Sequence, residues 1–302
     1  MSSVHTAVLL HEVVNGLGLA RNNKTLWYLD GTIGGSHHAL AIAEALKFKV
    51  NIIGLDRDPS AIKRAAEILE GKAEKIILEC QDFRHLDKSL DRNGITGVDY
   101  ILFDLGISSD ELENSGKGFS FLKDEPLLMT MGDPTNYTFT AKDIVNSWSE
   151  EDIANVIFAY GEERFARRIA RKIVSYRDKK SIETSAELAE IISLAIPTPI
   201  RFKHHRIHPA TRTFQALRIA VNDELSALKQ GLVVGYERLN VGGRMAVISF
   251  HSLEDRIVKN FYRFLADRGA EILTKKPKIA SAEETRENPR ARSAKLRIIE
   301  KI

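Results

Sequence analysis

The chain has little with which to cross-link itself or to anchor itself in a membrane. Its 302 residues include a single cysteine, Cys80, which excludes an intramolecular disulfide and a cysteine-rich zinc site. No apolar run approaches the roughly 18–20 residues of a membrane helix. The opening residues, MSSVHTAVLLHEVV, lack the basic and long apolar regions of a signal peptide. We therefore expect a cytoplasmic protein with no membrane partner.

Net charge is also low, at +3, so the total does not indicate a polyanionic partner. The basic residues are nevertheless gathered in three segments. Arg164–Lys180 holds eight Lys and Arg against one acid, Arg201–Arg218 holds five with three His and no acid, and Arg286–Arg297 holds five against one. Such clusters are typical of a nucleic-acid surface, although solvated helix faces share this composition. The presence of three clusters favours nucleic acid.

Three short hydrophobic runs in the first third of the chain each end in an acidic residue. The runs are Leu26–Asp30, Val50–Asp56 and Val98–Asp104, and turns or helical patterns follow them. Alternating strands and helices predict an α/β fold with a parallel sheet. Ligands of such sheets bind outside the carboxyl ends of the strands, where these acids would lie. The pattern favours a nucleoside-type cofactor, with S-adenosylmethionine as the first choice.

The alternation stops after Asp104 and resumes late in the chain. Residues 110–136 are irregular, residues 140–197 carry only helical patterns, and one long helix is expected from about Thr213 to Gly231. A strand over Arg244–Phe250 and a helix over Glu254–Leu265 restore the alternation. We expect an α/β domain of residues 1–136 and 213–302, interrupted by an all-helical domain of residues 137–212.

The turn after the first strand, Asp30-Gly-Thr-Ile-Gly-Gly35, suits a ligand that has no phosphate. It lacks the G-x-G-x-x-G pattern of dinucleotide sites, because Ile and Ser stand at positions 33 and 36. Asp56 ends the second strand 22 residues after Gly34, where a carboxylate can accept hydrogen bonds from both ribose hydroxyls. Phe83 follows the third strand and is placed to flank the adenine. The plainer interpretation of Asp56 is a helix-capping acid, a role that Asp58 fills better. The plainer interpretation of Phe83 is a core aromatic.

Asp104 is the predicted catalytic residue. It ends the strand expected beside the first one, so its carboxylate should lie near the transferable methyl group. Methyl transfer to an exocyclic amine needs the nitrogen held in line with the sulfonium carbon. A carboxylate can accept the N–H bond and take up the proton afterwards. The plainer interpretation is a turn acid that caps Ser108 or Ser109.

A helix expected over Glu162–Arg177 has two faces. At 100° per residue, its apolar residues Phe165, Ile169, Ile173 and Tyr176 lie opposite an arc of basic residues. The basic arc consists of Arg164, Arg167, Arg168, Arg171 and Lys172. Arginines on such a face contact phosphates and hold register without reading sequence. A simple amphipathic surface helix is the alternative.

The chain resembles the ribosomal RNA small subunit methyltransferase H family, also called MraW, over nearly its whole length. The resemblance rests on His5-Thr-Ala-Val-Leu-Leu10, Asp30-Gly-Thr, Asp56-Arg-Asp-Pro59, Asp104-Leu-Gly-Ile-Ser-Ser109, Gly118-Phe-Ser-Phe121, Gly161-Glu-Glu-Arg-Phe-Ala166, His208-Pro-Ala-Thr-Arg-Thr-Phe-Gln215, Ser249-Phe-His-Ser-Leu-Glu-Asp-Arg256 and Asn288-Pro-Arg-Ala-Arg-Ser293. It implies a Rossmann-like, S-adenosylmethionine-dependent methyltransferase domain of residues 1–136 and 213–302, with the inserted helical domain of residues 137–212 recognising RNA. It also implies transfer of a methyl group from S-adenosylmethionine to N4 of a cytidine in the decoding region of 16S rRNA. The partner would be 16S rRNA within the small ribosomal subunit, and a homodimer is left open.

The resemblance also implies site residues. Cofactor contacts are expected at Gly34, Gly35, Ser36, His37, His38, Asp56, Phe83, Asp104 and Glu111. The three basic clusters, rather than the resemblance, predict phosphate contacts from the basic arc and from Lys203, Arg206, Arg212, Arg290 and Arg292. No metal is expected, because the paired histidines have no cysteine or acidic partners at ligand spacing.

The chain departs from the family pattern at several of these positions. The turn reads Gly34-Gly-Ser-His-His38 where the family usually has Gly-Arg-Gly-Gly-His, and Glu111 stands for a usual Gln. Leu127-Leu-Met-Thr-Met-Gly132 stands where the family usually has Leu-Asp-Met-Arg-Met-Asp. An RNA-binding or ribosome-assembly protein of the same fold, with weakened or lost catalysis, is therefore an alternative. A dinucleotide-dependent oxidoreductase and a DNA amino-methyltransferase fit the motifs less well.

Overall fold

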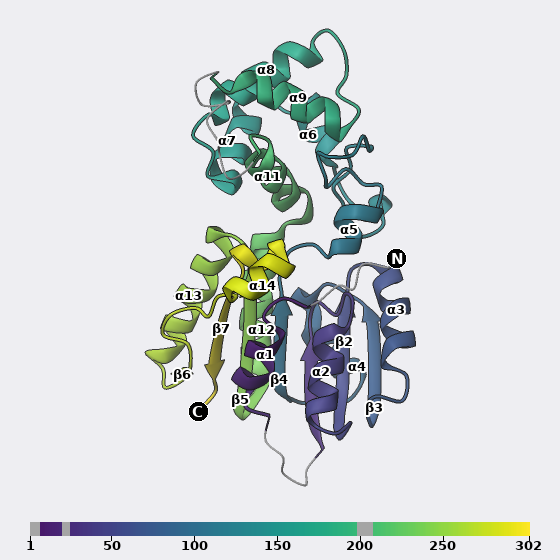
Figure 1. Cartoon of the computed structure of the whole chain (residues 1–302), viewed down its shortest axis with the longest axis vertical. Coiled ribbons are helices and arrows are strands. Elements are labelled where there is room, and N and C mark those ends of the chain that lie inside the picture. The colour runs from purple at the N-terminus through teal and green to yellow at the C-terminus, as the bar shows by residue number, and fades with distance from the viewer. Residues whose placement is uncertain (1–6, 20–24, 198–207) are drawn as a thin grey trace. The chain divides into compact units, whose positions relative to one another are not determined.

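A computed structural model describes residues 7–19, 25–197 and 208–302 (Figure 1). The chain forms two compact units. The sheet unit consists of residues 1–106 and 225–302, and the helical unit consists of residues 107–224. Within the described part of the chain, no helix is both long and apolar enough to cross a membrane.

The sheet unit is built on seven strands in the order β3-β2-β1-β4-β5-β7-β6. The strands are β1 (Leu26–Asp30), β2 (Val50–Asp56), β3 (Lys75–Cys80), β4 (Val98–Asp104), β5 (Leu239–Ser249), β6 (Glu271–Ile272) and β7 (Lys295–Glu300). The strands β3 to β5 are parallel along this order, whereas β7 is antiparallel to both of its neighbours. The parallel strands therefore bring the ends of β1, β2, β4 and β5 to one edge of the sheet.

Helices cover both faces of this sheet because the strands alternate their apolar side chains. In β4, Tyr100 and Leu102 pack on one face, and Ile101 and Phe103 on the other. Helices α1 (Leu10–Leu17), α2 (His37–Ala45) and α3 (Pro59–Leu69) cover the first face, and helices α4 (Leu86–Arg92), α12 (Glu224–Arg238) and α13 (Ser252–Ala266) cover the second. The short helix α14 (Ala282–Glu287) precedes β7. The predicted α/β class with a parallel sheet is confirmed.

The start of α3 shows how local sequence sets one of these elements. Asp58 is the N-cap, and its side chain accepts a hydrogen bond from the backbone N–H of Ser60. Pro59 occupies the first helical position, where its missing N–H leaves no intrahelical bond unmade. Both assignments agree with the sequence prediction.

The helical unit has a core of its own. Its helices are α5 (Ser109–Asn114), α6 (Ala141–Ser147), α7 (Glu150–Gly161), α8 (Ala166–Arg177), α9 (Ser185–Ala195) and α11 (Thr211–Asn222). Phe119, Leu127 and Met129 are buried in this core, and so are Phe214 and Leu217. The compact unit therefore extends on both sides of the residues 137–212 expected from the helical pattern.

Two helices differ from the sequence prediction. The single helix expected from Thr213 to Gly231 is wrong, because α11 ends at Asn222 and α12 begins at Glu224. Asp223 between them takes a left-handed conformation, with φ at 50°, which terminates the first helix. Likewise α8 begins at Ala166 rather than Glu162, because Glu162 is the left-handed C-cap of α7, with φ at 49°.

Candidate active site

Asp30 closes β1 with a buried carboxylate, only 2% of the residue being exposed. Its Oδ2 accepts a hydrogen bond of 2.7 Å from the Tyr28 hydroxyl, and its Oδ1 accepts one of 3.1 Å from the backbone N–H of Thr32. Burial raises the pKa of Asp30 to about 6, against the lowering effect of these two donors. The same burial, with the Asp30 charge beside it, raises the pKa of Tyr28 well above its usual value.

The turn after β1 holds a hydroxyl without a partner. Ser36 is the N-cap residue of α2, but it has φ at 60° and its side chain makes no capping bond. Its Oγ is buried and finds no hydrogen-bond partner in the described part of the chain. A buried hydroxyl in this condition is unfavourable unless a ligand completes it.

Gly34 and Gly35 complete the turn, and His37 and His38 follow it. Gly34 has φ at 40°, and a Cβ on Gly35 would lie 2.8 Å from Nδ1 of His37. Glycine at position 35 therefore leaves room for the exposed imidazole of His37. His38, by contrast, is buried.

Asp56 closes β2 and ties the two neighbouring turns together. Its Oδ2 accepts a hydrogen bond of 2.9 Å from the backbone N–H of Gly34, and its Oδ1 accepts one of 2.9 Å from that of Asp58. Burial raises the pKa of Asp56. Since each carboxylate oxygen has two lone pairs, both oxygens can still accept a further hydrogen bond from a diol.

Asp104 closes β4, which pairs with β1 as expected. Its backbone N–H donates to Oγ1 of Thr32 at 2.7 Å, while its side-chain Oδ1 is buried without a partner among the described residues. The other oxygen, Oδ2, lies 3.6 Å from Nδ1 of His38. Burial, followed by the charges of Asp30 and Glu254, raises the pKa of Asp104 to about 8.

His38 supports Asp104 in its neutral form. Its Nε2 lies 3.0 Å from the carbonyl of Val8, and only an N–H can donate to a carbonyl, so this nitrogen carries the proton. Burial lowers the pKa of His38 to about 4. The Nδ1 that faces Asp104 is therefore an unprotonated acceptor at neutral pH.

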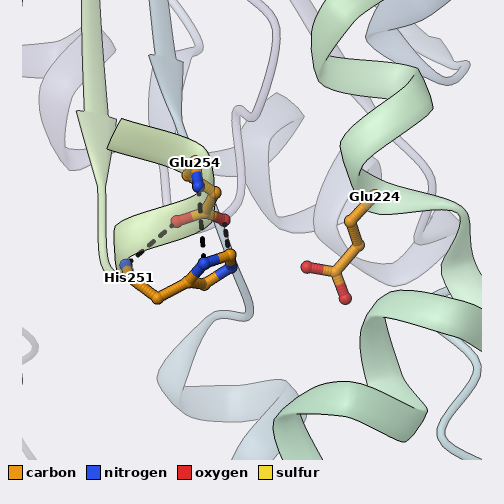
Figure 2. Close-up of side chains that lie close together, drawn as sticks. All are labelled: Glu224, His251 and Glu254. Carbon is orange, nitrogen blue, oxygen red and sulfur yellow. Dashed lines mark hydrogen bonds and ion pairs between the residues drawn. The ribbon is translucent and has the colours of Figure 1, made fainter. Parts of the chain in front are cut away.

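A histidine and a glutamate at the end of β5 were not singled out in the sequence prediction. Figure 2 shows His251 and Glu254 at the start of α13. Oε2 of Glu254 accepts hydrogen bonds from the backbone N–H groups of Phe250 at 2.8 Å and of His251 at 3.3 Å. The backbone N–H of Glu254 in turn donates to Nδ1 of His251. Nε2 of His251 lies 3.2 Å from Oε1 of Glu254 but makes no hydrogen bond within the described residues.

The signal for this pair was the spacing of three residues within Ser249-Phe-His-Ser-Leu-Glu-Asp-Arg256, which is that of a capping box. Glu254 is 3% exposed, so its charge acts on Asp104 through a poorly screened interior. Figure 2 also labels Glu224, whose two carboxylate oxygens each accept a hydrogen bond of 2.8 Å from Arg218.

Two predicted cofactor residues have clear structural roles. Phe83 is half-buried and packs on Phe103 with ring centroids 4.9 Å apart. A Cβ on Gly231 would lie 2.5 Å from the Phe83 ring, so that ring is also packed tightly against α12. In the helical unit, Glu111 forms a capping box with Ser108. The carboxylate of Glu111 accepts a hydrogen bond of 2.9 Å from the backbone N–H of Ser108. Cofactor contacts at Phe83 and Glu111 stay predictions.

The predicted basic arc lies on the exposed side of α8 and the residues before it. Arg164, Arg167, Arg168, Arg171 and Lys172 are all exposed, while Ile169 and Ile173 are buried in the helical core. Arg171 lies 3.5 Å from Glu150, and the Arg164 guanidinium covers the Phe165 ring. Arg167, Arg168 and Lys172 form no ion pair with the described residues. These three cations are the ones most available to a polyanion.

The other predicted phosphate contacts differ in their surroundings. Arg212 is exposed but is held by the Glu162 carbonyl at 3.3 Å and by Glu163 at 3.8 Å. Arg292 is exposed and Arg290 half-buried, on a short 3-10 turn whose Ala291 packs into the sheet core. Lys203 and Arg206, with the neighbouring His204 and His205, lie outside the described residues.

The edge of the sheet fits a cationic nucleoside. Asp30, Asp56 and Asp104 place three carboxyl groups at the ends of β1, β2 and β4. Asp30 is buried, Asp56 and Asp104 are half-buried, and desolvation raises the pKa of each. A ligand cation would offset the cost of ionising them. The unpartnered Oγ of Ser36 and Oδ1 of Asp104 supply further polar contacts. An S-adenosylmethionine molecule carries both a sulfonium cation and a ribose diol.

Residues 2–302 match the model of the MraW methylase family. The chain belongs to this family. It is 42% identical to the ribosomal RNA small subunit methyltransferase H of Brevibacillus brevis, with 100% of this chain and 99% of that relative covered. It is 44% identical to the protein of the same name from Heliobacterium modesticaldum, with 99% and 98% covered. A solved rRNA methylase from Streptococcus thermophilus matches with a TM-score of 0.46 and 10% identity, over 99% of each chain.

The cofactor of this methylase is S-adenosylmethionine, as expected from the ends of the strands. When bound, the cofactor supplies an electrophilic methyl group. Contact of the ribose with Asp56, contact of the nucleoside with the turn from Gly34 to Ser36, and the catalytic role of Asp104 stay predictions.

Proposed function

We propose that this methylase transfers a methyl group to the exocyclic N4 of a cytidine in the decoding region of 16S rRNA, within the small ribosomal subunit. Two relatives named ribosomal RNA small subunit methyltransferase H match this chain over nearly their whole length at 42% and 44% identity, which supports the proposal. The observation that carries the chemistry is Asp104, a half-buried carboxyl group at the end of β4 whose Oδ1 is buried without a partner among the described residues.

Asp104 acts as the hydrogen-bond acceptor for the amine. With Nδ1 of His38 unprotonated beside it, Asp104 is the group of this pair that exchanges a proton near neutral pH. Its free oxygen accepts one N–H of the cytosine amine and so localises the nitrogen lone pair for attack. As the new N–C bond forms and the C–S bond breaks, the amine loses a proton, which the Asp104 carboxylate takes up.

Methylation requires that the RNA backbone be bound by positive charge and that the target base be unstacked. An amine in a stacked base cannot reach a buried carboxylate, so the cytidine must be turned out of its stack. The exposed cations Arg167, Arg168 and Lys172 of α8 contact backbone phosphates, which fix the register of the RNA without reading its bases.

The test is methylation of small ribosomal subunits from cells that lack the modification, with the product mapped by mass spectrometry. We expect one methyl group on N4 of one cytidine of 16S rRNA. Asp104→Ala should lower the rate by about 100-fold or more, the range of general-base contributions. The matched variant Asp87→Ala on α4 should leave it unchanged. A methyl group at another atom or in another RNA would refute the assignment.

The same experiment separates the alternative of an RNA-binding or assembly protein. Such a protein would bind the subunit and leave it unmethylated at saturating cofactor, with wild type and Asp104→Ala indistinguishable.

A further inference from the structure

A cavity of about 230 Å³ opens on the sheet unit, beside α13. It is lined by Lys259, Tyr262, Arg263, Ile272, Lys275 and Arg297. The residues come from α13, from β6 and the segment after it, and from β7. Figure 1 shows these elements together beyond β5, at one margin of the sheet. We call this cavity the α13 groove.

Cations dominate the rim of the α13 groove. Lys259 and Arg263 are four residues apart, so they project from the same face of α13. Neither they nor Lys275 makes a hydrogen bond or ion pair with any residue that the structure describes. Three positive groups without counter-charges around one hollow repel one another, and an anion in the hollow would remove that repulsion.

The acids near the α13 groove do not neutralise it. Asp255 accepts hydrogen bonds from Arg297 at 2.7 Å and 3.3 Å, and Lys295 lies 3.4 Å from the same carboxylate. One acid thus serves two cations. Glu271 is adjacent to Ile272 on β6, and since Ile272 lines the groove, alternation directs Glu271 to the opposite face.

The floor of the α13 groove offers shape but no competing polar chemistry. Tyr262 is 1% exposed, and its hydroxyl donates to the carbonyl of Met245 at 3.1 Å. Ile272 adds an apolar wall. The cavity is smaller than the roughly 300–1,000 Å³ of sites for whole metabolites. Its size and charge suit a phosphodiester with part of a ribose rather than a nucleotide cofactor.

We propose that the α13 groove binds the phosphate backbone of the RNA substrate, as a second contact besides the α8 arc. This inference rests on the proposed RNA substrate. The basic arc of α8 belongs to the helical unit and the α13 groove to the sheet unit, so each compact unit would contact RNA through its own cations. The groove positions RNA and does no chemistry.

The test compares two variants that each remove two positive charges. Lys259→Gln with Arg263→Gln removes cations of the α13 groove, whereas Lys63→Gln with Lys88→Gln removes exposed lysines of α3 and α4. Affinity for a 16S rRNA fragment is measured over a salt series, together with kcat and KM for methylation. We expect the groove variant to bind about 10-fold more weakly at low salt and to raise KM with little change in kcat.

A plot of log affinity against log salt should also be less steep for the groove variant, by about 0.7–0.9 for each phosphate that it no longer neutralises. S-adenosylmethionine affinity should not change in either variant. Equal RNA affinity and salt slope in the two variants, while wild type methylates rRNA, would overturn the groove and leave the proposed function standing.

Failure of the proposed function gives a different result. If wild type neither binds nor methylates rRNA, elution from immobilised heparin still compares the two variants. If the groove variant elutes at lower salt than the control variant, the groove still binds a polyanion, but its ligand is not rRNA. Identical elution would end the proposal. If oligoglutamate displaces bound RNA as readily as unlabelled RNA does, the groove would be assigned to an acidic protein, and the proposal that it binds RNA would be overturned.

Discussion

His38 presents an unprotonated Nδ1 to Asp104, 3.6 Å from its Oδ2. The opposite nitrogen of the ring is fixed by the Val8 carbonyl, and burial lowers the pKa of the imidazole to about 4. Because burial raises the pKa of Asp104 to about 8, this carboxyl group is protonated at pH 7 while His38 stays neutral. This pair is therefore uncharged at pH 7.

Asp104→Asn should make the free energy of unfolding of the sheet unit less sensitive to rising pH. The folded pKa of Asp104, about 8, exceeds the ordinary value of 3.8, so between these values the folded state holds a proton that the unfolded state has released. The free energy of unfolding of the wild type thus falls as pH rises. We expect the stability of the Asp104→Asn variant relative to wild type to increase by about 1–4 kcal/mol from pH 5 to pH 8.

Urea denaturation followed by fluorescence measures this difference. The chain has two tryptophans, and Trp148→Phe leaves Trp27 of β1 to report on the sheet unit. The comparison isolates Asp104, because Asp30 and His38 titrate in both proteins. A difference that stays constant between pH 5 and pH 8 would mean that Asp104 is ionised in the folded state.

Asp56→Ala should weaken binding of S-adenosylmethionine by about 10-fold or more, because a hydrogen bond to a charged group contributes roughly 1.5–3 kcal/mol. The Asp56 carboxylate is the predicted ribose contact, and it also orders the backbone at Gly34. The matched control is Asp58→Ala, two residues away, which removes the cap of α3 and the nearby ion pair with Arg64 and should cost about 1 kcal/mol of stability. Calorimetric titration of both variants distinguishes the roles, and equal loss of affinity would show that any damage near this turn suffices.

Ser36→Gly should change stability and cofactor affinity in opposite directions. Ser36 has φ at 60°, a conformation that costs a non-glycine residue on the order of 1 kcal/mol, so glycine should raise the melting temperature. Loss of the unpartnered Oγ should weaken binding of S-adenosylmethionine several-fold. Ser36→Ala retains the backbone cost but lacks the hydroxyl, so it should weaken binding without raising stability. Unchanged affinity in both variants would place Ser36 outside the cofactor contacts.

The strands that carry the acids were predictable because each is a continuous apolar run that stops at a charge. β1, β2 and β4 have the predicted bounds. β6 and β7 were not predicted, since β6 has two residues and β7 alternates charged and apolar residues like many surface segments. The break at Asp223 was missed because the apolar stripe continues at helical spacing through both helices.

The partners of the acids were not predictable from the pattern. Asp104 bonds through its backbone to Thr32, 72 residues earlier, and its carboxyl group faces His38 of helix α2. Local sequence predicts where a carboxylate ends a strand, but the groups around it come from elements distant in the sequence. The raised pKa of Asp104 depends on burial and on Asp30 and Glu254, neither of which lies next to it in sequence.

The pairing of β4 with β5 constrains the order in which the molecule can be made. Val98 pairs with Leu239 and Asp104 with Ile248, so the entire helical unit is translated between two adjacent strands of one sheet. A nascent chain that has emerged as far as residue 224 contains β1 to β4 and the whole helical unit, which can then fold around its own core. Asp104 still lacks β5 and Glu254 at that stage, so the helical unit can be complete co-translationally while the surroundings of Asp104 are assembled late.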